Sequence, residues 1–265
     1  MSNRTTEQPF CQTRVMCRAV DNLELLLSQP DESVDLIYCD ILYGTGRNFG
    51  DYQDLKPIRS EIEAHYLPRL KEMHRVLKPT GSIYLQMDTR INHWLRCILD
   101  DIFGYDRFLN EIVWHYVMGS SSKNKYSKKH DVILLYSKSA YYKFNLNNIL
   151  VPLSIETIKR SKRGNARYSI ELNDNDGKNP SDVFLDINPI QGNGNENVNY
   201  VTQKPKKLIE RIIKASSNEG DTVADYYLGS GTTAVVCKEL NRNFIGCDIN
   251  PKAIEITNAR LDALS

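Results

Sequence analysis

Two short segments, far apart in the chain, carry residue types that could do chemistry together. Residues 222–233 read TVADYYLGSGTT, which predicts a strand, a glycine turn and the start of a helix. Residues 34–43 read VDLIYCDILY, which predicts a buried strand ending at Asp40, with Tyr43 just beyond it. A glycine turn at a helix start lets a ligand approach the backbone closely. An acid beside an aromatic ring suits a flat substrate that carries an amino group.

The glycine turn has the pattern Asp-x-x-x-Gly-Ser-Gly-Thr-Thr, beginning at Asp225. This is neither GxGxxG nor GxxxxGK[ST], which weakens the dinucleotide and P-loop interpretations. Asp225 ends its strand, where it can accept a hydrogen bond from a cationic amino group. Asp248 ends the next predicted strand and is placed to accept from both hydroxyls of a ribose. An acid for an amine together with an acid for a ribose favours S-adenosylmethionine over NAD.

The other segment suggests what the methyl group of such a cofactor would meet. An exocyclic aromatic amine is a poor nucleophile because its lone pair is delocalised into the ring, so methylation needs an acceptor for its protons and an electrophile held in line. Asp40 can be that acceptor, the carbonyl of Ile41 can be a second, and Tyr43 can stack on the ring. A duplex hides its bases, so the target base must be flipped out or single-stranded.

The elements around these segments alternate between strand and helix, which predicts an α/β fold with a mostly parallel sheet and helices on both faces. Ser60 is predicted to cap the helix that follows the Gly-rich loop at 44–60. Residues 15–27 are predicted to form a short strand and helix around Asp21. Further strands are predicted near 34–40, 82–87, 111–117, 131–137, 222–226 and 243–249, and helices near 60–77, 91–103, within 202–216 after Pro205, 232–240 and 251–262.

Composition limits the class of protein further. A chain of 265 residues with 41% hydrophobic content can form one large domain, or a domain with a substantial insertion. The six cysteines lack CxxC spacing, which argues against a zinc site and for reduced thiols in a cytosol, with Cys39 and Cys247 as packing residues. No apolar run approaches a membrane span, and no secretory signal is expected at the N-terminus.

Positive charge is concentrated in the middle of the chain, although the net charge is only +1. Residues 112–130 and 157–170 contain no acid. A solvated surface is the simpler interpretation of one basic stretch, but two in the same third of the chain favour contact with phosphates. Residues 138–200 are rich in Asn and weak in apolar periodicity, as in a recognition surface. The candidate DNA-binding residues are Lys123, Lys125, Lys128, Lys129, Arg160 and Arg163.

Taken together, the motifs resemble those of the amino-methyltransferases of bacterial restriction–modification systems, in the β arrangement where the catalytic motif precedes the cofactor motif. The resemblance covers nearly the whole chain and keeps the family's order of motifs. It is carried by the segments SVDLIYCDILYGTGRNFGDYQD, RVLKPTGSIYLQMD, EIVWHYV, KKHDVILLYSKS, TQKPKKLIERII and DYYLGSGTT.

The resemblance implies a Rossmann-like, S-adenosylmethionine-dependent methyltransferase fold and assigns roles to individual residues. Asp40 and Tyr43, with Ile41 between them, would be catalytic. Cofactor-binding roles would fall to Asp21, Asp40, Gln203, Lys204, Pro205, Asp225, Tyr227, Gly229, Ser230, Gly231, Thr232 and Asp248. No metal is implied.

The chain departs from the family at Ile41-Leu42, where the usual tetrapeptide is Asp-Pro-Pro-Tyr. Prolines fix φ and lack an N–H, so they pre-set the loop that aims the acceptor carbonyl. Ile and Leu keep the carbonyls but restore two donors and flexibility. Tyr227 replaces the usual Phe, a mild change.

The resemblance also implies a division of the chain and a set of partners. Residues 1–114 would form the catalytic half, 115–200 a target-recognition region with some core strands, and 201–265 the cofactor-binding half. The partners would be double-stranded DNA, a cognate restriction endonuclease and a second copy of the chain in a homodimer, with no membrane involved.

Several functions remain open at this stage. The leading hypothesis is a site-specific DNA methyltransferase acting on N6 of adenine in a flipped-out base, because Asp at position 40 leans toward adenine. The alternatives are methylation of cytosine N4, a degenerate non-catalytic DNA-binding subunit, and a small-molecule or protein methyltransferase, against which the basic middle third argues. The glycine pattern, which is not GxGxxG, argues against a dehydrogenase.

Overall fold

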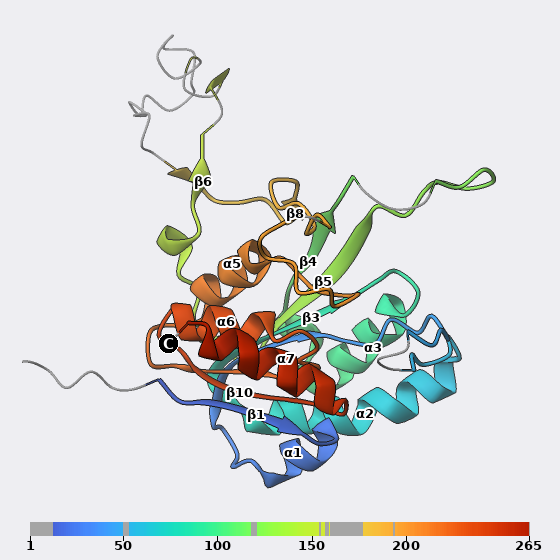
Figure 1. Ribbon diagram of the computed structural model, residues 1–265, viewed down its shortest axis with the longest axis vertical. Helices are drawn as coiled ribbons and strands as arrows, with labels where there is room; N and C mark the ends of the chain where they lie inside the picture. The colour runs from blue at the N-terminus through green and yellow to red at the C-terminus, as the bar shows by residue number, and fades with distance from the viewer. Residues whose placement is uncertain are drawn as a thin grey trace, which may run out of the picture.

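The computed structural model describes residues 13–49, 53–117, 121–153, 155–156, 159, 177–192 and 194–264, and its centre is a twisted sheet (Figure 1). Within these residues the sheet has eight strands in the order β1-β10-β9-β2-β3-β5-β4-β8. The strands are β1 Val15–Ala19, β2 Val34–Asp40, β3 Leu77–Met87, β4 Phe108–His115, β5 His130–Ser137, β8 Val183–Phe184, β9 Thr222–Asp225 and β10 Asn243–Asp248, with a separate small pair formed by β6 Val151–Pro152 and β7 Gly177–Lys178.

The predicted α/β class is confirmed, since five adjacent strands, β1 to β3 in the sheet order, run parallel. Only β5 reverses direction within the core of the described sheet, pairing antiparallel with β3 and with β4. The helices are α1 Asn22–Ser28, α2 Arg59–Val76, α3 Asn92–Phe103, α5 Lys206–Ser216, α6 Thr232–Glu239 and α7 Pro251–Asp262, with short 3-10 turns η1 Tyr105–Arg107 and η2 Leu146–Asn148.

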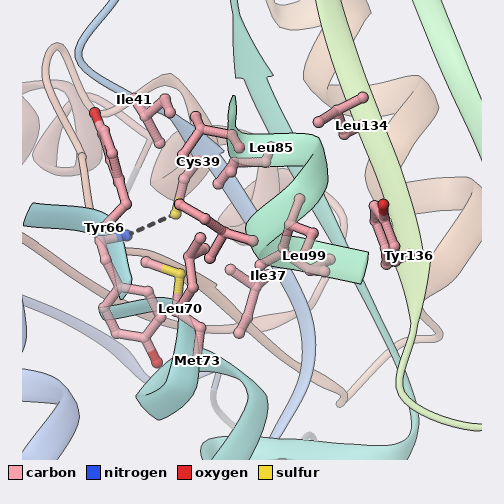
Figure 2. Packing of buried hydrophobic residues seen from close by; sticks show 14 of the residues in the cluster. Ile37, Cys39, Ile41, Tyr66, Leu70, Met73, Leu85, Leu99, Leu134 and Tyr136 are labelled. Carbon is pink, nitrogen blue, oxygen red and sulfur yellow. Dashed lines mark hydrogen bonds between the residues drawn. The ribbon is translucent and has the colours of Figure 1, made fainter. Parts of the chain in front are cut away.

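Helices cover both faces of the sheet, and each face has its own hydrophobic cluster. On one face α1, α2 and α3 pack against the sheet. Figure 2 shows part of this cluster, where Ile37 and Cys39 of β2 lie with Leu70 and Met73 of α2. On the other face α5, α6 and α7 supply a second cluster. Strands buried on both sides read as continuous apolar runs, which explains the sequence of β2.

The two segments with chemical residue types meet because β2 and β9 are neighbours in the sheet. Leu36 pairs with Val223, and Ile37 pairs with Ala224. From β2 the chain continues through α2 to β3 on one side, and from β9 it continues through α6 to β10 on the other. Such a point, where the connections diverge, leaves a crevice at the carboxyl ends of the strands.

Some boundaries differ from the sequence prediction. Ser60 is not an N-cap, because α2 already begins at Arg59 and the capping position is Ile58, which makes no side-chain cap. The helix therefore starts one residue early, directly after the turn at Pro57, and Glu61 and Ile62 donate to the Ile58 carbonyl. β3 begins at Leu77, five residues before the predicted strand at 82–87, so residues 78–81 belong to the strand.

Other local predictions are confirmed. Gly104 ends α3 with a φ of +92°, a conformation that suits glycine. Cys39 and Cys247 are fully buried and free. Among the described residues, no helix combines the length and apolarity that crossing a membrane requires.

Gly231 is the glycine of the turn at which an added side chain would clash most severely. It caps α6 with a φ of +75°, and a Cβ there would lie 2.2 Å from Thr257 Oγ1 on α7. Gly220 has a φ of +80° but nothing within 4 Å of its would-be Cβ.

We therefore predict that Gly231→Ala lowers the free energy of unfolding by about 2 kcal/mol more than Gly220→Ala, because both pay for positive φ but only the first is overpacked. Urea denaturation of the two variants measures the difference. Equal losses would show that α7 moves away without cost.

Candidate functional site

A cavity of about 570 Å³ opens at the carboxyl ends of β2 and β9. It therefore lies at the divergence point that the topology creates. Of the residues predicted to act in catalysis or cofactor binding, those that line it are Asp21, Asp40, Ile41, Tyr43, Lys204, Asp225, Tyr227, Gly229, Ser230, Thr232 and Asp248.

Asp225 is the most deeply buried carboxylate of the site, with 2% of its surface exposed. Its oxygens accept from the Thr233 hydroxyl at 2.6 Å and from the Tyr227 backbone N–H at 3.0 Å. Burial raises the pKa of Asp225 to about 7, and the charges of Asp40 and Asp248 add to this rise. These two hydrogen bonds do not neutralise the carboxylate, so a cationic ligand group would stabilise it.

Asp248 joins the end of β10 to the glycine turn. Its carboxylate accepts from the backbone N–H of Gly229 at 2.9 Å and from that of Asn250 at 2.9 Å. Burial raises the pKa of Asp248, while these backbone donors oppose the rise. The side chain is thereby held at the cavity wall, where a hydroxylated ligand can reach it.

Asp21 occupies the corresponding place after β1, but its charge is already compensated. It caps α1 by accepting from the Leu23 N–H at 2.8 Å. Arg69 of α2 pairs with it at 2.8 Å and also donates to Asn22. Asp21 thus orients the wall of the cavity through a structural contact.

Asp40 and Tyr43 are far from Asp225 and Asp248 in the sequence, yet they line the same cavity. The Tyr43 hydroxyl is 2.8 Å from Asp40 Oδ1, and Lys204 forms an ion pair with the other oxygen of the carboxylate. Lys204 Nζ also lies 5.4 Å from the centre of the Tyr43 ring. Burial raises the pKa of Asp40, which Lys204 opposes and Asp131 reinforces.

The two residues that replace Pro-Pro are held by hydrogen bonds, one donated by a restored N–H and one accepted by a carbonyl that proline would also carry. The Ile41 N–H donates to the Gln86 carbonyl at 3.1 Å, which extends the β2–β3 pairing past Asp40. The Ile41 side chain is 3% exposed and packs in the core. The Leu42 carbonyl accepts from the Tyr66 hydroxyl at 2.8 Å. Interstrand pairing and a buried phenol therefore hold this loop where prolines would stiffen it.

Three predicted cofactor-binding residues support the site without lining the cavity. Gln203 donates to the Glu196 carbonyl at 2.7 Å and accepts from the Val198 N–H at 2.9 Å. Pro205 stands at the start of α5, and Gly231 packs against Thr257.

The structure brings four of the predicted DNA-binding residues together at a distance from the cofactor candidates. Lys123, Lys125 and Lys128 are exposed on the β4–β5 connection, which extends away from the sheet, and Lys129 is half-buried at its base (Figure 1). Arg160 and Arg163 lie outside the described residues.

Sequence reasoning did not identify Asp131, a second acid that contacts the Tyr43 hydroxyl. Asp131, at the start of β5, accepts from the Tyr43 hydroxyl at 2.7 Å and from Gln86 Nε2 at 3.0 Å. In the sequence KKHDVILLYS, Asp131 stands only near the start of a predicted strand. Its position beside the site follows from the pairing of β5 with β3. Thr233, in contrast, is the last residue of the GSGTT motif and could have been added from the pattern.

A nucleoside cofactor with a cationic end fits this lining. Asp225, Asp40 and Asp248 place negative charge around one cavity, and the pKa of each is raised by burial. A bound ammonium or sulfonium would relieve that unfavourable burial. The glycine turn lies at the start of α6, where a polar ligand atom is favoured by the helix dipole.

Comparison with known proteins agrees with this chemistry. The N6/N4 methyltransferase family model, described as DNA methylase, matches residues 34–259. The type II methyltransferase M.HpaI of Haemophilus parainfluenzae is 37% identical over 255 residues, which cover 94% of this chain and 74% of that protein.

This chain belongs to the N6/N4 DNA methylase family.

Another relative of this methylase is the DNA adenine methyltransferase YhdJ of Escherichia coli strain K12, 34% identical over 92% of this chain and 82% of that protein. Solved structures share its fold at lower identity. The cytosine-N4-specific PvuII DNA methyltransferase has a TM-score of 0.68 at 18% identity and covers 94% of this chain and 86% of that one. The complex of M1.HpyAVI with S-adenosylmethionine has a TM-score of 0.59 at 18% identity, with 94% and 99% covered. The enzyme is an S-adenosylmethionine-dependent DNA methyltransferase.

The pKa of Asp225 sets an expected pH dependence of cofactor binding. If Asp225 faces the ammonium of S-adenosylmethionine, only its ionised form contributes, so binding expels a proton below pH 7. We predict that the Kd rises by up to about tenfold per pH unit as the pH falls from 7 to 6, and that this rise levels off between pH 7 and pH 7.5. Isothermal titration calorimetry in buffers of different ionisation enthalpy measures the Kd and the proton release.

The matched variant is Asp225→Asn, which should bind more weakly at pH 8 and lose most of the dependence. A Kd for the unaltered enzyme that does not change between pH 6 and pH 8 would remove Asp225 from this role.

Proposed function

We propose that this methylase transfers the methyl group of S-adenosylmethionine to the exocyclic N6 of adenine in a base flipped out of double-stranded DNA. The observation that carries the proposal is the position of Asp40, which ends a strand adjacent to the strand of Asp225, and of Tyr43 just beyond it, since all three line the same cavity. A cofactor bound by Asp225 and Asp248 would therefore present its methyl group toward an acid and an aromatic ring.

In this mechanism Asp40 accepts a hydrogen bond from the amine and then its proton. The raised pKa of Asp40 makes its carboxylate a stronger proton acceptor than an exposed aspartate. The ring of Tyr43 lies at the cavity wall beside it, suited to stacking on a flat base. Bound S-adenosylmethionine supplies the electrophilic methyl group.

Lys204 has a distinct part in the proposal. Its ammonium pairs with Asp40, so the carboxylate is ionised and oriented before a substrate arrives. The backbone carbonyl of Lys204 accepts from the Thr232 hydroxyl at 3.2 Å, which ties the segment before α5 to the glycine turn. One residue thus links the acid of the catalytic half to the cofactor half.

Adenine is favoured over cytosine by two observations. Position 40 is Asp, which leans toward adenine within the family. The relative YhdJ, at 34% identity, is named a DNA adenine methyltransferase. Methylation of cytosine N4 is the second candidate, supported by the fold shared with the PvuII enzyme.

The remaining partners follow from the relatives. M.HpaI is a type II methyltransferase, so we propose that this enzyme protects DNA from a cognate restriction endonuclease in the cytosol. A homodimer is a further proposal by analogy. We also propose that residues 115–200 recognise the target sequence, with the lysines of the β4–β5 connection on phosphates.

Removal of the Asp40 carboxylate tests its role in catalysis. Asp40→Ala should lower the rate of methyl transfer at least 100-fold, because the amine loses its proton acceptor, while binding of S-adenosylmethionine changes little. The measurement is single-turnover transfer of labelled methyl groups to DNA, followed by chromatography of the nucleosides.

Chromatography also identifies the base. N6-methyladenine is the expected product, and N4-methylcytosine would select the second candidate. Absence of both products from the unaltered enzyme on DNA of many sequences would support a non-catalytic DNA-binding subunit instead, and unchanged turnover in the variant would remove Asp40 from the mechanism.

Removal of positive charge from the β4–β5 connection tests its role in DNA binding. Each phosphate contact made by a lysine contributes about 0.9 to the slope of log K against log salt. The double variant Lys123→Gln, Lys125→Gln should therefore reduce the slope for DNA binding by about 1.8. Fluorescence anisotropy at several salt concentrations measures it.

Lys71→Gln is the matched control, because Lys71 is exposed on α2, away from this connection (Figure 1). It should leave the slope unchanged. An unaltered slope in the double variant would place the DNA on another surface.

A further inference from the structure

The hydroxyl of Tyr43 lies between two carboxyl groups. It is 2.8 Å from Asp40 Oδ1 and 2.7 Å from Asp131 Oδ2. A phenol carries one proton and can donate to one of these oxygens at a time. The second contact is a hydrogen bond only when the other carboxyl group carries a proton. Asp40, Tyr43 and Asp131 therefore hold protons as a unit.

Asp131 is fixed in this place by donors from neighbouring strands. Its side chain is 5% exposed. Gln86 of β3 donates to it at 3.0 Å, and the Tyr116 hydroxyl, just beyond β4, donates to the other oxygen at 3.1 Å. Gln86 is held in turn by the Tyr38 hydroxyl at 2.7 Å. These hydrogen bonds fix the position of the Asp131 carboxyl group without a neutralising cation.

The charge balance around the two acids is unequal. Asp40 has Lys204 as an ion-pair partner, whereas among the described residues the bonded partners of Asp131 are the two phenols and the amide. Movement of a proton from Asp40 to Asp131 restores the ion pair between Asp40 and Lys204.

We propose that Asp131 is a positioning residue that receives, through the hydroxyl of Tyr43, the proton that Asp40 takes from the amine. The proposal rests on the proposed role of Asp40. As the carbon–nitrogen bond forms and the carbon–sulfur bond of the methyl donor breaks, the amine proton passes to Asp40 Oδ1. The Tyr43 oxygen then takes that proton while its own passes to Asp131 Oδ2, which leaves Asp40 ionised for the next cycle.

The route continues toward solvent at Tyr116. Its hydroxyl contacts the second oxygen of Asp131, and its side chain is only half-buried. The relay thus connects an enclosed acid to the surface by way of β5 and the end of β4. Tyr43 keeps its ring at the cavity wall throughout, because only its proton moves.

Other charged groups bear on the protonation of this unit and must be counted. Asp131 raises the pKa of Asp40, and Lys204 lowers it. The titratable and charged groups that face the two carboxyl groups are Tyr38 and Cys39 on β2, Asp225 on β9, Lys204 before α5, Tyr43 after β2, and Tyr116 after β4, with Asp88 and Arg90 beyond Tyr116.

The test compares Asp131→Asn, Tyr43→Phe and the double variant in single-turnover methyl transfer between pH 5 and pH 9. Asparagine can still accept from Tyr43 but cannot take a proton. We expect each single variant to slow transfer about tenfold at saturating DNA with KM unchanged, which is less than the roughly 100- to 10,000-fold contributed by a direct proton acceptor. The double variant should be no slower than the slower single variant, because both interrupt one route.

The pH profile gives a readout that a purely structural role would not move. Removal of the negative charge of Asp131 lowers the pKa of Asp40, so ionised Asp40 persists to lower pH. The acid limb of the rate profile should therefore shift to lower pH in Asp131→Asn. A wild-type rate and profile in this variant, or losses that multiply in the double variant, would overturn the proposal.

Asp100→Asn is the matched control. Asp100 accepts from the Tyr136 hydroxyl at 2.5 Å on the α3 side of the sheet, so it loses a similar carboxylate–phenol contact away from the cavity. It should transfer methyl groups at the wild-type rate. If Asp131→Asn does not fold, Tyr43→Phe alone decides, since a wild-type rate and profile there would exclude the relay.

Failure of the proposed function gives a different result. If the unaltered enzyme makes neither methylated base, or if Asp40→Ala keeps full activity, the assignment of Asp40 fails. If Asp40→Ala is inactive while Asp131→Asn is unchanged, only the relay fails.

Discussion

The pairing of β2 with β9 is the contact on which the rest of the site depends. It is short, with Leu36 opposite Val223 and Ile37 opposite Ala224, and it joins parts of the chain almost 190 residues apart. Because parallel strands end at the same edge of a sheet, the pairing sets Asp40 and Asp225 at one edge whatever the loops around them do. The apolar clusters on the two faces hold the strands in register, so the core has a direct part in aiming the acids.

This arrangement concentrates negative charge where water is scarce. Asp225, Asp248 and Asp40 share one cavity, and burial raises the pKa of each. The fold offsets this with backbone N–H groups at Asp225 and Asp248 and with Lys204 at Asp40. What is left uncompensated favours a positively charged ligand, which matches the dependence of the enzyme on S-adenosylmethionine.

Local patterns in the sequence predicted much of this. The strand ends, the glycine turn and most helix boundaries come from short-range signals, and each lies within a few residues of its predicted place. The prediction that Ser60 caps α2 was wrong, because the helix begins at Arg59, directly after the turn at Pro57, without a side-chain cap. Asp131 and Gln86 could not be found, since their importance arises from the antiparallel pairing of β5 with β3, and no local signal reports which strand lies beside which. The substitution at Ile41 shows the same limit, because the acceptor for its N–H is on β3.

The order of strands in the sheet has a consequence for how the protein is made. β1 and β2 are consecutive in the chain, but β10 and β9 lie between them. During synthesis β9 and β10 leave the ribosome after the other strands of the described sheet, so the earlier strands must wait with an open gap or pair wrongly across it. A nascent chain therefore presents β2 with an unpaired parallel edge, and β9 and β10 later close the middle of the sheet instead of extending its rim.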